Sequence, residues 1–132
     1  MNLLGNLFRD HLFRSASFAK PTALYISLHT ENGVEVSGPG YQRAQLNPGD
    51  ANWAADGDGE ASNAQPVVFG EPEGDWGRIA GYALWDAPRG GRNLTGVREL
   101  QKKKNINDGD GAPHFQAGSL SFRFEFDLST DG

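Results

Sequence analysis

Residues 120–128 read Leu-Ser-Phe-Arg-Phe-Glu-Phe-Asp-Leu, in which five apolar side chains alternate strictly with four polar ones. Because successive side chains of a β-strand point to opposite faces, this segment has one apolar and one polar face. The apolar residues are Leu120, Phe122, Phe124, Phe126 and Leu128. A strand of this kind belongs to a sheet that covers a core with one face only. The segment therefore predicts a mainly β fold.

Short strand-like segments precede it along the chain, separated by turn-forming residues such as Asn32-Gly33. They are residues 22–30, 34–36, 41–46, 65–69, 78–85 and 93–100, and residues 101–107 could continue the last of them. Seven or eight strands without intervening helices predict an antiparallel β-sandwich or jelly roll. Residues 47–63 lack periodicity and are interpreted as a long excursion with Trp53 as its apolar anchor.

Two of these strands allow a prediction of which side chains face the core. In residues 22–30 we expect Leu24, Ile26 and Leu28 to point inward, and Tyr25, Ser27 and His29 outward. In residues 78–85 we expect Ile79, Gly81, Ala83 and Trp85 to share one face. Trp76 and Trp85 flank this strand, and we expect them to close the two ends of the core. Exposed instead, they would form a platform for stacking sugars.

Residues 2–14 give the one convincing helix. Leu4, Leu7, Phe8, His11 and Leu12 recur at three- and four-residue steps and form an apolar stripe. An isolated helix of this length is marginal in water, so it must dock either on its own sheet or on a neighbouring subunit. We expect a single domain over residues 1–132, with a docking helix in 1–14 and a β-sandwich in 22–128.

The composition limits the classes of function. With 132 residues the chain can bury roughly two-thirds of its unfolded surface, and it has no cysteine for disulfides or thiolate sites. Twelve basic and 17 acidic residues give a net charge of −5, which argues against nucleic-acid binding. No apolar run has the ~20 residues of a membrane span, and charges interrupt the N-terminal stretch as a signal peptide. We therefore expect that the chain binds neither nucleic acid nor a membrane, and that it is synthesised in a cytoplasm and not exported.

Motifs for catalysis or cofactor binding are weak. The three histidines lie in separate segments, and neither a nucleophile elbow nor a phosphate-binding loop occurs. We therefore expect no enzyme and no cofactor. Asp56, Asp58 and Glu60 resemble half of a calcium loop, but the closing bidentate Glu is missing. The basic run Lys102, Lys103 and Lys104 suits contact with an acidic protein surface better than nucleic acid.

Several short motifs in their order resemble a family of small virion proteins of tailed bacteriophages. The motifs are residues 7–14, residues 21–30, Glu35-Val36-Ser37-Gly38 with Tyr41 and Arg43, Ser62-Asn63, Asp75-Trp76-Gly77, Leu84-Trp85-Asp86 and residues 117–120. Members are commonly labelled tail fibre proteins, and phage capsid cement proteins are similar in size. The chain departs from the pattern in residues 47–59, in Lys102–Lys104 and in its charged final strand.

The resemblance implies a non-enzymatic structural protein of the virion that binds the major capsid protein or tail proteins and forms a homo-oligomer. A fibre needs reach, and the chain has neither repeats nor heptads. We therefore expect a capsid cement or decoration subunit first, a tail component second and a carbohydrate-binding module third. The residues expected to dock on partners are Leu4, Leu7, Phe8, Leu12, Trp53, Lys102, Lys103 and Lys104.

Overall fold

The computed structural model describes residues 3–15, 17, 19–57 and 59–123. Within these ranges one helix is followed by nine strands, and every strand pairing is antiparallel. The elements are α1 Leu3–Phe13, β1 Tyr25–Thr30, β2 Ala44–Gln45, β3 Trp53–Ala55, β4 Glu60–Asn63, β5 Val67–Val68, β6 Gly77–Trp85, β7 Arg98–Ile106, β8 His114–Phe115 and β9 Ser121–Arg123.

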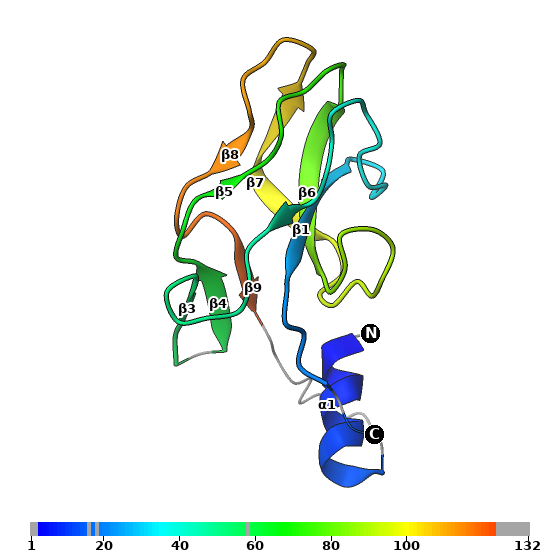
Figure 1. The fold of residues 1–132 in the computed structure, drawn as a ribbon, viewed down its shortest axis with the longest axis vertical. Helices are drawn as coiled ribbons and strands as arrows, with labels where there is room; N and C mark the ends of the chain where they lie inside the picture. Colours follow the sequence, from blue (N-terminus) through cyan, green and yellow to red (C-terminus); the bar gives the residue numbers. More distant parts are fainter. Residues whose placement is uncertain (1–2, 16, 18, 58, 124–132) are drawn as a thin grey trace.

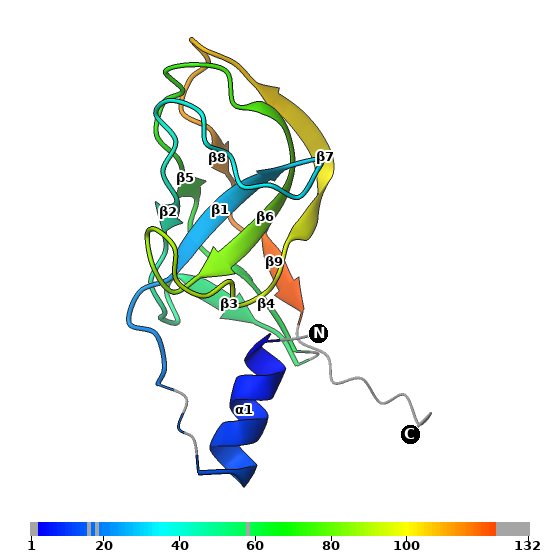
Figure 2. The same ribbon diagram turned by 90° about the vertical axis from the view of Figure 1, so that its right-hand side faces the viewer.

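The strands form two layers with the core between them. One layer is a four-stranded sheet in the order β2-β1-β6-β7, and the other contains the sheets β3-β4-β9 and β5-β8 (Figures 1 and 2). The predicted mainly β antiparallel fold with one N-terminal helix is confirmed. The layers fit a sandwich, while the strand order gives no specific indication of a jelly roll.

The strand predicted over residues 120–128 begins as expected. Leu120 and Phe122 are almost completely buried, Ser121 is half-buried and Arg123 is exposed. Residues 124–128 of the predicted strand lie outside the described residues. The ring of Phe122 contacts Tyr82 edge-on at 5.3 Å between ring centres, which ties β9 to β6 across the core.

Ser27 and His29 lie on the face of β1 opposite the core residues Ile26 and Leu28, as predicted, but this face is buried and not in contact with solvent. Ser27 and His29 are 0% and 3% exposed, because Trp85 and the turn after β1 cover this face of the sheet. The indole N–H of Trp85 donates to Ser27 Oγ at 2.7 Å. His29 Nδ1 lies 3.0 Å from the carbonyl oxygen of Gly33, within the turn. These contacts satisfy the buried polar groups, as burial requires.

A bulge in β6 also overturns the prediction that Ile79 shares a face with Gly81, Ala83 and Trp85. The pairing of β6 with β7 shifts register between Ile79 and Gly81, so the alternation of faces changes there. Ile79 belongs to the core together with Tyr82 and Leu84. Trp85 therefore lies on the outer face and does not close the core.

Trp76 does close the core, as predicted. It is 5% exposed, and its indole N–H donates to the carbonyl oxygen of Pro39 at 2.8 Å. Gly38 makes room for this ring, because a Cβ there would lie 2.5 Å from the Trp76 Cδ1 atom.

Residues 47–63 contain a hairpin that the prediction of an excursion missed. β3 and β4 pair through Trp53↔Asn63, and β4 continues the sheet to β9. The strands have three and four residues, too few to show a period of two in the sequence. The strands predicted at 22–30, 41–46 and 65–69 occur with shorter bounds, and β6 begins one residue earlier than predicted. The strand predicted at 93–100 begins only at Arg98 and continues to Ile106, and β8 was not predicted. Residues 34–36 contribute one bridge between Glu35 and His29.

Candidate docking surfaces

The helix α1 presents an apolar face to solvent. Phe8, Leu12 and Phe13 are 47%, 57% and 81% exposed, and Leu7 is half-buried. Phe8 and Leu12 are four residues apart and therefore lie on the same side of the helix. The side chain of Leu4 lies outside what the structure describes. In both views α1 lies beyond the ends of the strands, below the two sheet layers (Figures 1 and 2).

This exposure bears on the question of where the helix docks. None of the close packing between described elements involves α1, which spans 11 residues. Helices of this length are marginal in water and gain most of their stability from a packed apolar face. The exposed face of α1 is therefore available for docking on a neighbouring molecule.

A second apolar surface lies at the end of the sandwich. It is a groove of about 370 Å³ with Leu84, Leu94 and Phe122 buried at its base and Leu24 and Trp53 half-buried at its sides. Its rim includes Lys20, Pro21, Pro48, Gly49, Asp50, Ala55 and Ala61. We call this surface the apolar groove.

Trp53 has a defined orientation in the apolar groove. Its ring packs against Phe122 at 6.0 Å between centres, and its indole N–H donates to the carbonyl oxygen of Leu46 at 3.1 Å. The predicted docking residue is thus half-buried and fixed in place. It presents the remaining part of its ring to whatever enters the groove.

The three lysines lie on β7, at the edge of the four-stranded sheet. Lys102, Lys103 and Lys104 are exposed, and Lys103 Nζ lies 3.9 Å from a Glu31 carboxylate oxygen that also pairs with Arg78. Exposed pairs of this kind contribute at most about 1 kcal/mol. Lysines along an edge strand discourage unwanted strand pairing. They can also form ionic contacts at the rim of an interface.

The calcium candidates are only partly visible. Asp56 Oδ1 accepts the backbone N–H of Glu60 at 3.0 Å, so this carboxylate closes the β3–β4 hairpin. Asp58 lies outside the described residues. Among the residues that the structure describes, no group of three or more His, Asp or Glu side chains has the arrangement of a metal site.

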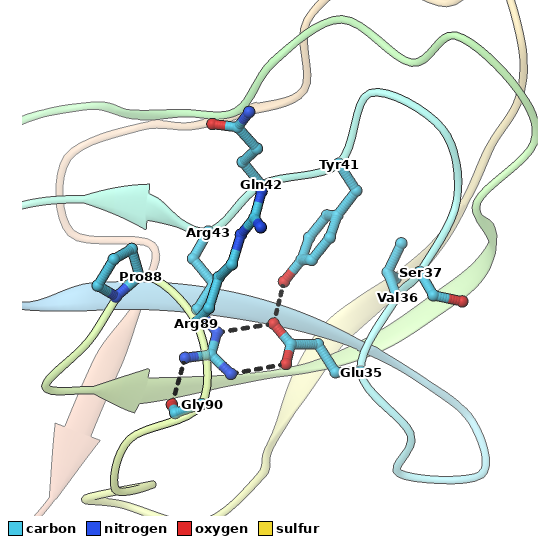
Figure 3. A pocket seen from close by; sticks show the side chains of 9 residues that line it. All are labelled: Glu35, Val36, Ser37, Tyr41, Gln42, Arg43, Pro88, Arg89 and Gly90. Carbon is cyan, nitrogen blue, oxygen red and sulfur yellow. Dashed lines mark hydrogen bonds and ion pairs between the residues drawn. The ribbon is translucent and has the colours of Figure 1, made fainter.

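Sequence reasoning missed a rigid clamp around Arg43, which lines a hollow of about 540 Å³ (Figure 3). Arg43 Nε and Nη2 each donate to a Glu35 carboxylate oxygen at 2.8 Å, and Nη1 donates to the carbonyl oxygens of Ala87 and Gly90 at 2.9 and 2.8 Å. One side chain thereby joins the segment after β1, the start of β2 and the loop after β6. The signal in the sequence was Glu35, Tyr41 and Arg43, quoted above only as part of the resemblance.

Tyr41 completes the clamp. Its hydroxyl donates to Glu35 Oε2 at 2.7 Å and accepts the backbone N–H of Leu28 at 3.0 Å. Burial raises the pKa of Glu35, but the hydrogen bonds from Arg43 and Tyr41 and the charge of Arg43 outweigh it, so this pKa lies below its usual 4.5. Burial and then the Glu35 carboxylate raise the pKa of Tyr41. Glu35 therefore stays charged and Tyr41 stays a donor at neutral pH.

Ser27 and His29 form the type of pair seen in nucleophilic catalysis, with Ser27 Oγ 2.7 Å from His29 Nε2. Ser27 is completely buried, and its oxygen already accepts the indole N–H of Trp85. A substrate cannot reach this oxygen. Ser27 instead links β1 to β6 through its hydrogen bond with Trp85.

The tryptophans give little support to a sugar-stacking platform. Trp76 is buried, and the Arg43 guanidinium covers one face of the Trp85 ring at 3.8 Å from its centre.

Among the described residues, no helix is both long and apolar enough to cross a membrane.

Comparison with known protein families identifies the family of this chain. Residues 1–123 match the family described as podophage GP4 fiber I protein gp80. The chain belongs to this family. It is therefore a phage fibre protein, a structural component of the virion whose contacts are with other virion proteins, as the resemblance to tailed-phage virion proteins implied. No curated protein matches the chain.

Membership in the fibre family agrees with the kind of surface that the structure presents. The predicted docking residues fall on three separate places: Leu7, Phe8 and Leu12 on α1, Trp53 in the apolar groove, and the lysines on β7. The clamp around Arg43 holds loops together and exposes no reactive group.

Proposed function

We propose that the chain is a non-enzymatic structural subunit of a podophage tail fibre. The observation that carries this proposal is the match of residues 1–123 to a fibre family, since it spans both α1 and the strands of the sandwich. It favours the tail component over the capsid cement or decoration subunit, which sequence reasoning placed first because the chain lacks repeats.

In this proposal α1 is the arm that holds the subunit to its neighbours. Its apolar face is exposed at Phe8, Leu12 and Phe13, although each large apolar side chain gains about 1.5–3 kcal/mol from full burial. Residues 22–123 supply the rigid body, and the apolar groove and Lys102–Lys104 supply further contacts. A short compact subunit can act as the attachment or joint of a fibre without supplying its whole length.

Copy number and position on the particle test the proposal. Virions are separated into heads and tails, and the chain is quantified by mass spectrometry against the major capsid protein. We expect it in the tail fraction at a few copies to a few dozen per particle. Hundreds of copies in the head fraction, with immunogold label over the whole shell, would establish the cement alternative instead.

The role of the arm has its own test. Virions produced with a chain that lacks residues 1–14 should contain at least tenfold less of it than wild-type virions, while the purified truncated protein keeps its β-type circular dichroism. Undiminished incorporation of the truncated chain would show that α1 is not the attachment arm. A conservative control is Arg9→Lys, which should be incorporated normally.

A further inference from the structure

Two apolar surfaces of the chain are left at least partly exposed by the described residues, and they suit each other. The face of α1 offers Phe8 and Leu12 four residues apart, the spacing by which a helix inserts side chains into a groove. The apolar groove offers Leu24, Trp53 and Phe122 around an opening at the end of the sandwich. Each surface gains from burial against an apolar partner.

The link between the two surfaces starts at the groove itself. Lys20 and Pro21 line the rim, so the segment that leads back to α1 leaves the body there. Residues 14–19 lie between α1 and this rim, and the seven steps from Phe13 to Lys20 span up to about 25 Å when the chain is extended. The described residues of this connector, among them Ser15, are exposed, as is Lys20. The arm can therefore extend to an adjacent molecule.

Charge favours contact between arm and body. Residues 1–14 carry two basic side chains and one acidic side chain, and the rest of the chain carries ten basic and 16 acidic ones. The arm thus has a net charge of +1 and the remainder −6, and Lys20 and the exposed Asp50 both lie on the groove rim. Arg9 lies on α1, where it pairs with Asp10, and Arg14 follows the helix directly, so an acidic body attracts the arm while two bodies repel each other.

The structure also indicates whose groove the arm enters. While α1 is attached to this body, Phe8, Leu12 and Phe13 remain exposed and the groove remains open. Among the described residues, the position of α1 on its own chain therefore leaves both surfaces at least partly exposed. Exchange of identical elements between copies is an economical way to build an oligomer, reciprocally in a dimer or head to tail in a ring.

We propose that the α1 helix of one copy docks in the apolar groove of a second copy, with Phe8 and Leu12 against Trp53 and Phe122. This inference rests on the proposed function, because a fibre subunit must be held by its neighbours. It assigns the neighbour as another copy of the same chain.

Disulfide trapping tests the exchange directly, because the chain has no cysteine of its own. The full-length Leu12→Cys protein, labelled with ¹⁵N, is mixed with unlabelled full-length Ala55→Cys protein and oxidised. The expected product is the mixed disulfide between labelled and unlabelled chains, at least tenfold above the yield with Lys103→Cys, an exposed control on β7. A yield equal to this control would overturn the proposal.

A double variant distinguishes docking of α1 in the groove of another copy from docking in the groove of its own chain. If Leu12→Cys/Ala55→Cys gives mainly a monomer with an internal disulfide in dilute solution and at high concentration alike, the helix belongs to its own groove and the proposal fails. Linked dimers or larger rings support it. Sedimentation should agree, with wild-type protein at two or more times 14.3 kDa and Leu12→Asp at least tenfold weaker in self-association.

Trapping inside virions distinguishes this inference from the proposed function. A Leu12→Cys chain in assembled tails that links to a different virion protein overturns the exchange and leaves the fibre role intact. A chain that is absent from tails, yet gives the mixed disulfide in solution, supports the exchange and removes the fibre role.

Discussion

The guanidinium of Arg43 lies 3.8 Å from the centre of the Trp85 ring, while its nitrogens hold both oxygens of Glu35. The side chain of Arg43 is only 6% exposed, so this stack and ion pair are largely removed from water. The indole N–H of Trp85 continues the contact inward to Ser27. One arginine therefore fastens two loops onto the outer face of the sheet.

Replacing Arg43 by Lys should destabilise the fold by about 2–3 kcal/mol, because an ammonium keeps the charge but cannot serve a carboxylate and two carbonyls while stacking on a ring. Chemical denaturation followed by Trp fluorescence measures the change. Arg89→Lys is the matched control, since Arg89 is exposed on the same loop and should change stability by less than about 0.5 kcal/mol. Equal effects of the two substitutions would contradict the clamp.

Stability should depend on pH through Glu35. Its pKa is lowered in the folded state, so its contribution is complete above the unfolded value of about 4.5 and is lost as the pH falls through the folded value. Glu35→Gln should be less stable than wild type by about 1–2 kcal/mol at pH 7, and the difference should shrink below pH 4.5. Urea unfolding between pH 7 and pH 3 measures both curves. If the unfolding free energies of wild type and Glu35→Gln differed by the same amount at every pH in this range, Glu35 would not be the cause of the pH dependence.

The regular part of the fold could be predicted from the sequence, because periodicity reports burial within one element. The helix in α1, the long strand β6 and the alternation at Leu120–Phe122 all follow from such patterns. Strands of two to four residues, such as β3 and β4, are too short to show a period. The bulge between Ile79 and Gly81 depends on the partner strand, and no local pattern announces it.

The clamp and the groove could be predicted less well, because distant segments build them. Arg43 meets Gly90 across 47 residues of sequence, and Ser27 meets Trp85 across 58. A polar residue on an alternating strand looks solvated until the loop that covers it is known, which is why Ser27 and His29 were placed outward. Phe8, Leu12 and Trp53 were marked for docking, but only the structure shows that α1 leaves Phe8 and Leu12 exposed and that Trp53 lines a groove.

Asn63 should be essential for the second layer of the sandwich. It is 1% exposed, its amide donates to the carbonyl oxygens of Gln65 and Gln116 at 2.9 Å each, and its oxygen accepts the Leu120 N–H at 2.9 Å. Asn63→Ala should cost about 2–4 kcal/mol, because it leaves these backbone groups without their partner. Guanidinium unfolding measures the loss. Asn52→Ala, which removes one exposed hydrogen bond to Asn47, should cost less than about 1 kcal/mol.

Two phenylalanines should behave in opposite ways. Phe122 is 1% exposed and packs against Tyr82 and Trp53, so Phe122→Ala should lower the free energy of unfolding by about 3–5 kcal/mol. Phe13 is 81% exposed on α1, and Phe13→Ala should change the free energy of unfolding by less than about 0.5 kcal/mol at concentrations where the chain is monomeric. Urea unfolding at low micromolar protein tests both. If Phe13→Ala cost as much as Phe122→Ala under these conditions, α1 would be packed in the core of its own subunit, and it could not serve as an arm for another.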